Sequence, residues 1–474
     1  MSRVADPRDH PGLDVVTLRG LHLNASRVVL AVTLVMALVH FAGVVGRGVR
    51  PRVVRGDAVH YYVQLRSAVF DHDLDFANDY DGLYTLDFKI SVPPPGFTVT
   101  HERTVTGHVR NFMPVGPALL WAPLFLVVTG ATYLLSIVGL AYSPDGYGLA
   151  LQLVPDVCGV AAAGLAMWFT YLLVTAITTP RAALGATLAI LAGSPLIYYA
   201  IVSPAYSHAL SAMGASAFLL YWWNTRDRTD LRRYAAVGAL AGLTALIRWQ
   251  DGLLLATVLL DVVAHARAGR LARGRLAVFA LSRLAIAGAA ALIVFSPQMI
   301  VWQVLYGQPL TIPQGAGFVR WTASQVTAVL FSPYRGLFSW TPLTAVGIAG
   351  LVALWKKQPR LVATLALFFV VSTYINGAVA DWWAGEAFGA RRYLSCFPIF
   401  AVGLAALLSL DGIRGVVARV AAVCLAVANL FLLLHYEVFL TGLTALAPYP
   451  DNWYTLWVER FLIPLRLAAH VLHW

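Results

Sequence analysis

A carboxylate at the start of a polar segment is the first candidate for chemistry in this sequence. The segment reads GDAVHYYVQLRSAVFDHDLDFANDYDG, so that Asp57 is followed by His60 and Tyr61 and then by Asp73 and Asp75. An ionised carboxylate can take a proton from a hydroxyl group, and several together can hold a cation. We therefore interpret the segment as a candidate site for general-base catalysis. A helix N-cap at Asp57 and a solvated turn at the acidic run are the structural alternatives.

Arginine side chains occur in three further polar segments that lie between apolar runs. Arg248 and Gln250 belong to RWQD, Arg335 belongs to SPYRGLFSWTPL, and Glu386, Arg391 and Arg392 belong to DWWAGEAFGARRYL. A guanidinium group keeps its charge and can hold two phosphate oxygens at once. Anchoring at a membrane boundary is the alternative. These segments are candidates for binding an anionic group such as a phosphate.

The composition indicates what kind of fold must position these residues. Of the 474 residues, 59% are hydrophobic and 12% are charged, with a mean hydropathy of +0.71, whereas about a quarter of an ordinary soluble domain is charged. Apolar runs near the roughly 20 residues that a span requires occur at 28–45, 149–177, 183–202, 205–223, 234–250, 251–265, 281–302, 337–355, 361–380, 393–410 and 415–435. The sequence therefore predicts an all-α, multi-pass membrane protein.

Basic loops predict the orientation of these runs. The loops contain Arg226, Arg228, Arg232 and Arg233, then Arg267, Arg270, Arg273 and Arg275, and finally Lys356, Lys357 and Arg360. The positive-inside rule places all three loops in the cytoplasm, so that the polar segments at 47–110, 248–251, 303–335 and 381–392 face outward together. The net charge of +11 is explained by these loops, and no nucleic-acid partner is expected. The three cysteines form neither a disulfide framework nor a zinc motif.

The stretch 112–148 is apolar but is interrupted by proline and glycine. A single crossing there would invert every later loop, so we expect the stretch to enter and leave on one side or to lie partly in the interface. The expected organisation is a cytoplasmic segment at 1–27, a membrane domain at 28–435 with a first outer loop at 46–112, and an outer segment at 436–474. Trp453, Trp457 and Arg460 in that last segment predict an interfacial helix.

The order of the motifs resembles a known superfamily. GDAVHYY, DHDLDFANDY, NFMPVGPALLWAP, RWQD, SPYRGLFSWTP and WWAGEAFGARRYL, spread over 28–436, resemble the GT-C membrane glycosyltransferases, in particular bacterial relatives of protein O-mannosyltransferases and aminoarabinose transferases. The resemblance implies a GT-C-like fold of about 11 to 13 transmembrane helices in the bacterial cytoplasmic membrane. It also implies a sugar donor carried on a polyprenyl phosphate, an extracytoplasmic active site, and Asp57 as catalytic base. Ala58 replaces the second residue of the usual acidic pair, so no metal site is predicted, although a divalent cation stays an open alternative.

The expected activity follows from these roles. A sugar would move from its lipid phosphate to a hydroxyl group of a lipid, glycan or protein, with inversion at the anomeric carbon. Asp57 would act as base, and Arg248, Arg335, Arg391 and Arg392 would bind the phosphate. The further candidates are His60, Tyr61, Asp73, Asp75, Gln250 and Glu386. A glycan ligase or polymerase with a pyrophosphate-linked donor, a lipid or sugar transporter or flippase, and a non-catalytic scaffold are the alternatives.

Overall fold

The computed structural model describes residues 15–46, 48, 52–88, 102–140, 145–267, 273–385 and 387–472. Within these ranges the chain is helical, and β-type pairing is limited to isolated bridges between Arg103 and Val109 and between Val319 and Val379. The predicted all-α fold class is confirmed.

Helices follow one another with short connections along most of the described chain. Their order is α1 (Val15–Gly46), α2 (Asp57–Arg66), the π-helix η2 (Ser67–Asp71), α3 (Ala77–Phe88), α4 (Gly116–Ile137), α5 (Leu149–Gln152), α6 (Val154–Thr175), α7 (Pro180–Ala192), α8 (Leu196–Ile201), α9 (Ser207–Asn224), α10 (Leu231–Ile247), the 3-10 helix η4 (Trp249–Ala256), α11 (Thr257–Arg267), α12 (Arg273–Tyr306), the 3-10 helix η5 (Trp321–Ala323), α13 (Val326–Phe331), α14 (Leu337–Trp340), α15 (Leu343–Leu354), α16 (Pro359–Ala378), the 3-10 helix η6 (Arg391–Cys396), α17 (Phe397–Leu408), α18 (Gly412–Leu440), the π-helix η7 (Thr455–Glu459) and α19 (Arg460–Leu472).

Seven segments of the described chain are long and apolar enough to cross a membrane. They are Asn24–Gly46, Gly116–Ile137, Leu149–Thr175, Gly274–Tyr306, Pro359–Ala378, Arg391–Leu408 and Gly412–Leu440. Shorter apolar helices at Pro180–Ala192 and Leu343–Leu354 correspond to two more of the predicted runs. Every predicted run is therefore helical, whereas the number of 11 to 13 crossings stays a prediction.

Two glycines fix α10 against α12. Gly238 and Gly242 lie one turn apart, and a Cβ atom on them would come within 2.1 Å of the Ala287 carbonyl oxygen and within 2.5 Å of the Ala291 carbonyl oxygen. Small residues at this spacing allow two helix backbones to approach closely, which favours helix association in a membrane. The position of α10 in the bundle is thereby determined.

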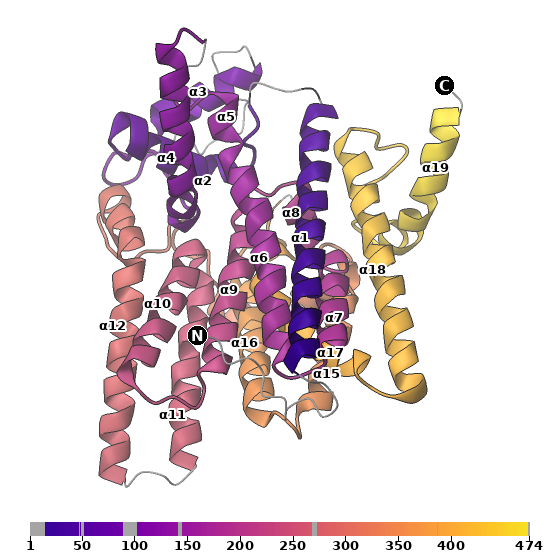
Figure 1. The fold of residues 1–474 in the computed structure, drawn as a ribbon. Coiled ribbons are helices and arrows are strands. Elements are labelled where there is room, and N and C mark those ends of the chain that lie inside the picture. The colour runs from indigo at the N-terminus through magenta and orange to yellow at the C-terminus, as the bar shows by residue number, and fades with distance from the viewer. Residues whose placement is uncertain are drawn as a thin grey trace.

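Helix α10 connects polar clusters at opposite ends of the bundle. Its 17 residues extend over about 25 Å. Near its start, Arg233 Nη1 lies 2.5 Å from Asp261 Oδ2, and Asp261 also accepts hydrogen bonds from Arg360 and Trp222. Arg248 follows its other end. Figure 1 shows α2, α3 and α4 gathered at one end of the molecule and the ends of α11 and α12 at the other. The basic loops and the predicted outer segments are thus separated as expected.

The first outer loop holds both ends of α4. Before the helix, the Met113 carbonyl accepts a hydrogen bond from Gln64, and after it, the Gly146 carbonyl accepts one from Tyr62 at 2.6 Å. The ring of Tyr62 also lies 5.8 Å from that of Phe125 within α4. Because the chain returns to the loop from which it left, this arrangement fits the expected same-side return of 112–148.

The carboxyl-terminal segment contains the expected helix. Helix α19 lies beside α18, with the rings of Phe431 and Phe461 5.8 Å apart (Figure 1). Arg466 in α19 forms an ion pair with Glu459, the residue immediately before this helix. The location of this helix at a bilayer surface stays a prediction.

Candidate active site

Asp57 lies at the start of α2, and its carboxylate faces an arginine from the far end of the sequence. Gly56 occupies the N-cap position, and no side chain caps the helix, so that Asp57 is not the N-cap considered above. Arg391 Nη1 instead donates a hydrogen bond to Asp57 Oδ2 at 2.6 Å. The side chains of Asp57 and Arg391 are 25% and 11% exposed. Within the described residues, the other carboxylate oxygen, Oδ1, has no hydrogen-bond partner and remains available as a proton acceptor.

Tyr206 secures this pair from the loop before α9. A Cβ atom on Gly56 would lie only 1.9 Å from Tyr206 Oη, and Gly56 has a φ of +54°, a backbone conformation that favours glycine. The Arg391 guanidinium lies 5.6 Å from the centre of the Tyr206 ring, within cation–π range. The hydroxyl therefore contacts the backbone just before Asp57, while the ring contacts the partner of Asp57.

A second arginine joins the same region through α9. Arg248 Nη1 donates hydrogen bonds to His208 Nδ1 at 3.0 Å and to Ser207 Oγ at 3.3 Å. Ser207 Oγ shares a hydrogen bond of 2.9 Å with the hydroxyl of Tyr61 on α2. With its amide oxygen turned toward Arg248, Gln250 accepts from Nε at 3.2 Å and from Nη2 at 2.7 Å. Tyr61, Arg248 and Gln250 are therefore brought together as predicted from their common face.

The hydroxyl of Tyr61 is kept protonated by its surroundings. Burial, followed by the nearby Asp57 carboxylate, raises the pKa of Tyr61 to about 12, against the opposing effects of Arg248 and Arg391. Tyr61 can therefore serve as a hydrogen-bond donor or acceptor but not as an anion at neutral pH.

Arg392 is held by a carboxylate of its own. Its Nη2 donates to both oxygens of Asp381, at 2.8 and 2.9 Å, and its Nη1 donates to the Asp381 carbonyl at 2.8 Å. The guanidinium groups of Arg248, Arg391 and Arg392 all lie within electrostatic reach of the buried His208 ring. Three of the four predicted phosphate-binding arginines therefore lie in the neighbourhood of His208, and one of them, Arg391, contacts Asp57.

Arg335 belongs to a different environment. It is 4% exposed, adopts a φ of +64° in the loop before α14, and donates from Nε to Tyr449 Oη at 2.6 Å. The ring of Tyr334 lies 4.8 Å from its guanidinium. In the part of the chain that the structure describes, no direct contact joins Arg335 to Asp57 or to the other three arginines. Its role in phosphate binding stays a prediction.

His60 lies in the interior of the first outer loop. Its Nδ1 lies 2.6 Å from Tyr80 Oη, and its ring packs between the rings of Tyr80 and Phe112, with centroids 5.3 and 5.5 Å away. Burial lowers the pKa of His60 to about 4, and the negative charge of Asp57 only partly opposes this shift. The imidazole is therefore neutral at physiological pH and joins α2 to α3.

The acidic run follows the far end of the helix that Asp57 begins. From Asp57 to Asp71, α2 and η2 extend over about 20 Å. Asp73 Oδ1 accepts hydrogen bonds from Ser67 Oγ at 2.7 Å and from the Asp75 amide at 3.1 Å. Asp73 and Asp75 thus form a turn that is separated from Asp57.

Other features of the site concern metals and cavities. Glu386 lies outside the described residues, and among those described no group of three or more His, Cys, Asp or Glu side chains could hold a metal ion.

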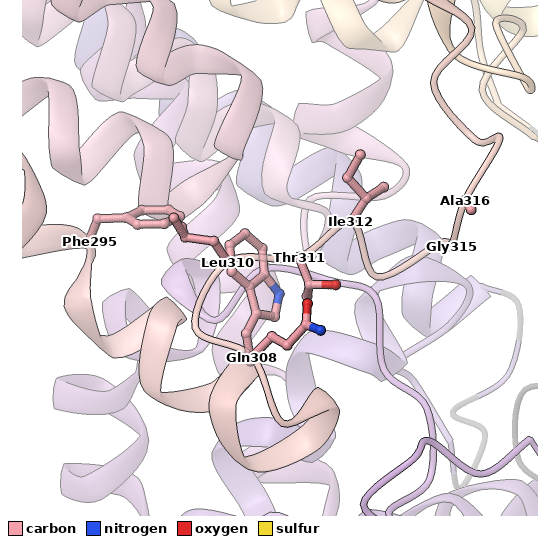
Figure 2. A pocket seen from close by; sticks show the side chains of 8 residues that line it. Phe295, Gln308, Leu310, Thr311, Ile312, Gly315 and Ala316 are labelled. Carbon is pink, nitrogen blue, oxygen red and sulfur yellow. The ribbon is translucent and has the colours of Figure 1, made fainter.

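A cavity of about 690 Å³ lies beside α12 and the segment that follows it (Figure 2), lined by Phe295, Trp302, Gln308, Leu310, Thr311, Ile312, Gly315 and Ala316. No titratable side chain lines this cavity, so it supplies neither a base nor a phosphate ligand.

Sequence reasoning did not assign the residues of the loop before α9. Tyr206, Ser207 and His208 follow Pro204 in SPAYSHAL, between two apolar runs. The basic loop after α9 is predicted to be cytoplasmic, so this loop must lie on the outer face. The alternation of inner and outer loops is the sequence signal that could have identified these residues as candidates for the site.

Comparisons with known proteins identify the fold. No protein-family model matches the sequence, and no curated protein matches it. The oligosaccharyltransferase AglB from Archaeoglobus fulgidus, solved in complex with an inhibitory peptide and a dolichol-phosphate, aligns with a TM-score of 0.50 and 12% identity over 93% of this chain. The apo form of the Archaeoglobus fulgidus enzyme gives 0.48 at 12% identity over 93% of this chain, and the chain covers 56% of each of the two proteins. The chain thus shares its fold with the archaeal oligosaccharyltransferase AglB.

Proposed function

We propose that the protein is a glycosyltransferase that moves a sugar from a polyprenyl-phosphate carrier to an acceptor hydroxyl, with Asp57 as general base. The observation that carries the proposal is the 2.6 Å pair of Asp57 and Arg391 beside Arg248 and Arg392, at one end of a helical membrane bundle. A base and a set of fixed cations are what transfer from a phosphate leaving group requires. The GT-C-like fold supports the same assignment.

The proposed reaction is a direct displacement. The acceptor oxygen attacks the anomeric carbon, its proton passes to Asp57 Oδ1, and the bond from the anomeric carbon to the phosphate oxygen breaks with its electron pair on that oxygen. Arg248 and Arg391 neutralise the charge that develops on the phosphate. Attack from the face opposite the leaving group inverts the anomeric centre. Arg391 also orients the Asp57 carboxylate by its hydrogen bond to Oδ2, which leaves Oδ1 to accept the proton.

The proposed setting is the outer face of a bacterial cytoplasmic membrane. Basic loops on the inner end of the bundle support this orientation. The acceptor is a lipid, glycan or protein, and the apolar surfaces of the helices would hold the isoprenoid chain of the carrier. A transporter would require polar coupling groups near the middle of the membrane, whereas the charged clusters around Arg248 and around Asp261 lie at the two ends of α10.

The main competing activity uses the same cations with a different donor. A glycan ligase, polymerase or oligosaccharyltransferase takes its sugar from a pyrophosphate carrier, and three arginines could also bind that larger group. Binding to undecaprenyl phosphate and to undecaprenyl pyrophosphate, measured with the purified full-length protein in detergent, separates the two. Preference for the monophosphate is expected. Preference for the pyrophosphate would replace the proposed donor, and binding to neither would overturn the proposal.

A further inference from the structure

His208 is a buried histidine whose hydrogen bond determines its tautomer. It is 1% exposed at the start of α9, and its Nδ1 lies 3.0 Å from Arg248 Nη1. A guanidinium group can only donate hydrogen bonds, so Nδ1 must be the acceptor. In the neutral ring the proton is then on Nε2. His208 therefore presents an N–H group on the side away from Arg248.

That N–H group has no protein acceptor. Within the described residues, His208 Nε2 and the hydroxyl of Tyr199 are both buried without a hydrogen-bond partner. The centroids of the two rings are 4.5 Å apart, so the unused groups belong to one small region. Buried polar groups of folded proteins are nearly always paired, and an unpaired group therefore calls for an explanation such as a ligand.

The region also carries a positive charge that is in direct contact with no carboxylate among the described residues. Arg391 is paired with Asp57, and Arg392 is paired with Asp381. The hydrogen bonds of Arg248 instead go to the neutral side chains of Ser207, His208 and Gln250. An anionic oxygen would both balance this charge and accept the hydrogen bonds of the unused donors.

We infer that His208 Nε2 and the Tyr199 hydroxyl bind phosphate oxygens of the lipid carrier, in a subsite where Arg248 fixes the His208 tautomer from the other side of the ring. The inference rests on the proposed function and assigns to it two neutral ligands that the sequence did not indicate. Tyr199 contacts Tyr206 at a centroid distance of 5.8 Å, and Tyr206 reaches Gly56, so that the subsite is adjacent to Asp57. The carrier phosphate would then lie near the general base.

Two substitutions of His208 distinguish ligand binding from a structural role. The amide oxygen of Asn lies where Nδ1 of histidine lies, whereas the amide nitrogen of Gln reaches the position of Nε2. His208→Asn therefore keeps an acceptor for Arg248 but removes the outward donor, and His208→Gln restores that donor. Binding of undecaprenyl phosphate to the full-length protein in detergent micelles and KM for the sugar donor are the measurements.

We expect His208→Asn to weaken binding of the probe about tenfold, and His208→Gln to weaken it markedly less. Tyr199→Phe should weaken it several-fold, with a larger change in KM than in kcat. Tyr234→Phe removes another buried, unpartnered hydroxyl at the start of α10 and should leave binding unchanged.

Normal binding in His208→Asn, or better binding in that variant than in His208→Gln, would overturn the inference while the proposed function stands. If the wild-type protein bound neither undecaprenyl phosphate nor its pyrophosphate, the proposed function would fail, and this subsite with it.

Discussion

Asp57 Oδ2 and Arg391 Nη1 are 2.6 Å apart, although 334 positions separate the two residues in the chain. The contact joins the first outer loop to the segment before α17, and it is made at the end of the bundle opposite the basic loops. Because both side chains are only partly exposed, the pair is shielded from full screening by water. The pair orients the carboxylate with one oxygen engaged and the other free.

Asp57→Asn should abolish sugar transfer while leaving the protein folded. The amide cannot accept the acceptor proton, and loss of a general base typically lowers the rate on the order of 100-fold to 10,000-fold. Asp57 does not cap α2, so thermal unfolding should change little. Carrier binding should persist, because Arg391 then has no carboxylate competing with the phosphate. Transfer at the normal rate in this variant would exclude Asp57 as the base. Asp75→Asn, in the separate acidic turn, is the control.

Arg391→Ala should weaken carrier binding and transfer, and Arg391→Lys should restore only part of the loss. An ammonium group is a point charge and cannot make the two-pronged contact of a guanidinium. Arg103→Ala, which removes a half-exposed arginine of the same outer loop, should bind the carrier normally. Full activity of Arg391→Ala would show that the residue is a boundary anchor only.

Arg392→Ala is expected to weaken carrier binding as well, but by a partly indirect route. The substitution leaves Asp381 without its bidentate partner and so adds a negative charge to the site. The double variant with Asp381→Asn should therefore recover some binding. Equal binding in the single and double variants would contradict this explanation.

Gly56→Ala should destabilise the protein and lower its activity. The new Cβ would meet Tyr206 Oη at 1.9 Å, and the φ of +54° is strained for alanine by about 1–2 kcal/mol. Adding Tyr206→Phe should relieve the contact but not the backbone strain. Gly48→Ala is a matched control, because Gly48 has a φ of +75° and no neighbouring atom within 4 Å. Thermal unfolding and transfer rates of the three variants separate the two contributions.

His60 should make the protein less stable as the pH falls. Its pKa is lowered from 6.5 to about 4 in the folded protein, so the unfolded chain takes up a proton first. The associated stability is complete above pH 6.5 and is lost as the pH falls toward 4, by up to about 3 kcal/mol. His60→Gln should therefore flatten the decline in unfolding temperature between these pH values. His108→Gln should not, and an unchanged slope in His60→Gln would contradict the assigned burial effect.

The orientation can be tested with cysteines introduced one at a time, after replacing Cys158, Cys396 and Cys424 with Ala. A cysteine at Asp75 or at Gln308 should react with an impermeant thiol reagent from outside intact cells. A cysteine at Thr229, in an inner basic loop, should react only after the membrane is opened. The reverse pattern would place the site on the cytoplasmic face.

Individual residues of the candidate site show what could be predicted from the sequence alone. Apolar runs and the parity of basic loops were sufficient to place Asp57, Arg248 and Arg391 on one face, and the structure joins them through direct contacts and a common neighbourhood. The same reasoning placed Asp73 on the same face as Asp57 but could not show that the two residues are far apart. Loop parity predicts only the face, and it gives no distance between two residues on that face. The sequence also left Arg335 with the others, although its left-handed backbone conformation places its side chain against Tyr449.

Residues without charge were the hardest to assign. Tyr206 lies just before α9 and His208 in its first turn, and aromatic residues at a membrane boundary are usually explained by the interface alone. Their roles depend on contacts with Gly56 and Arg248, which follow from the packing of α9 against neighbouring segments.

The buried ion pairs of Asp261 hold the helices together at the end of the bundle that carries the basic loops. Asp261 is fully buried, and it joins α9, α10, α11 and α16 through Trp222, Arg233 and Arg360. Separating these helices at this end would leave a buried charge without its partner, which is strongly destabilising. If the protein takes up a lipid carrier as proposed, we expect the accompanying rearrangements to occur at the opposite end of the bundle.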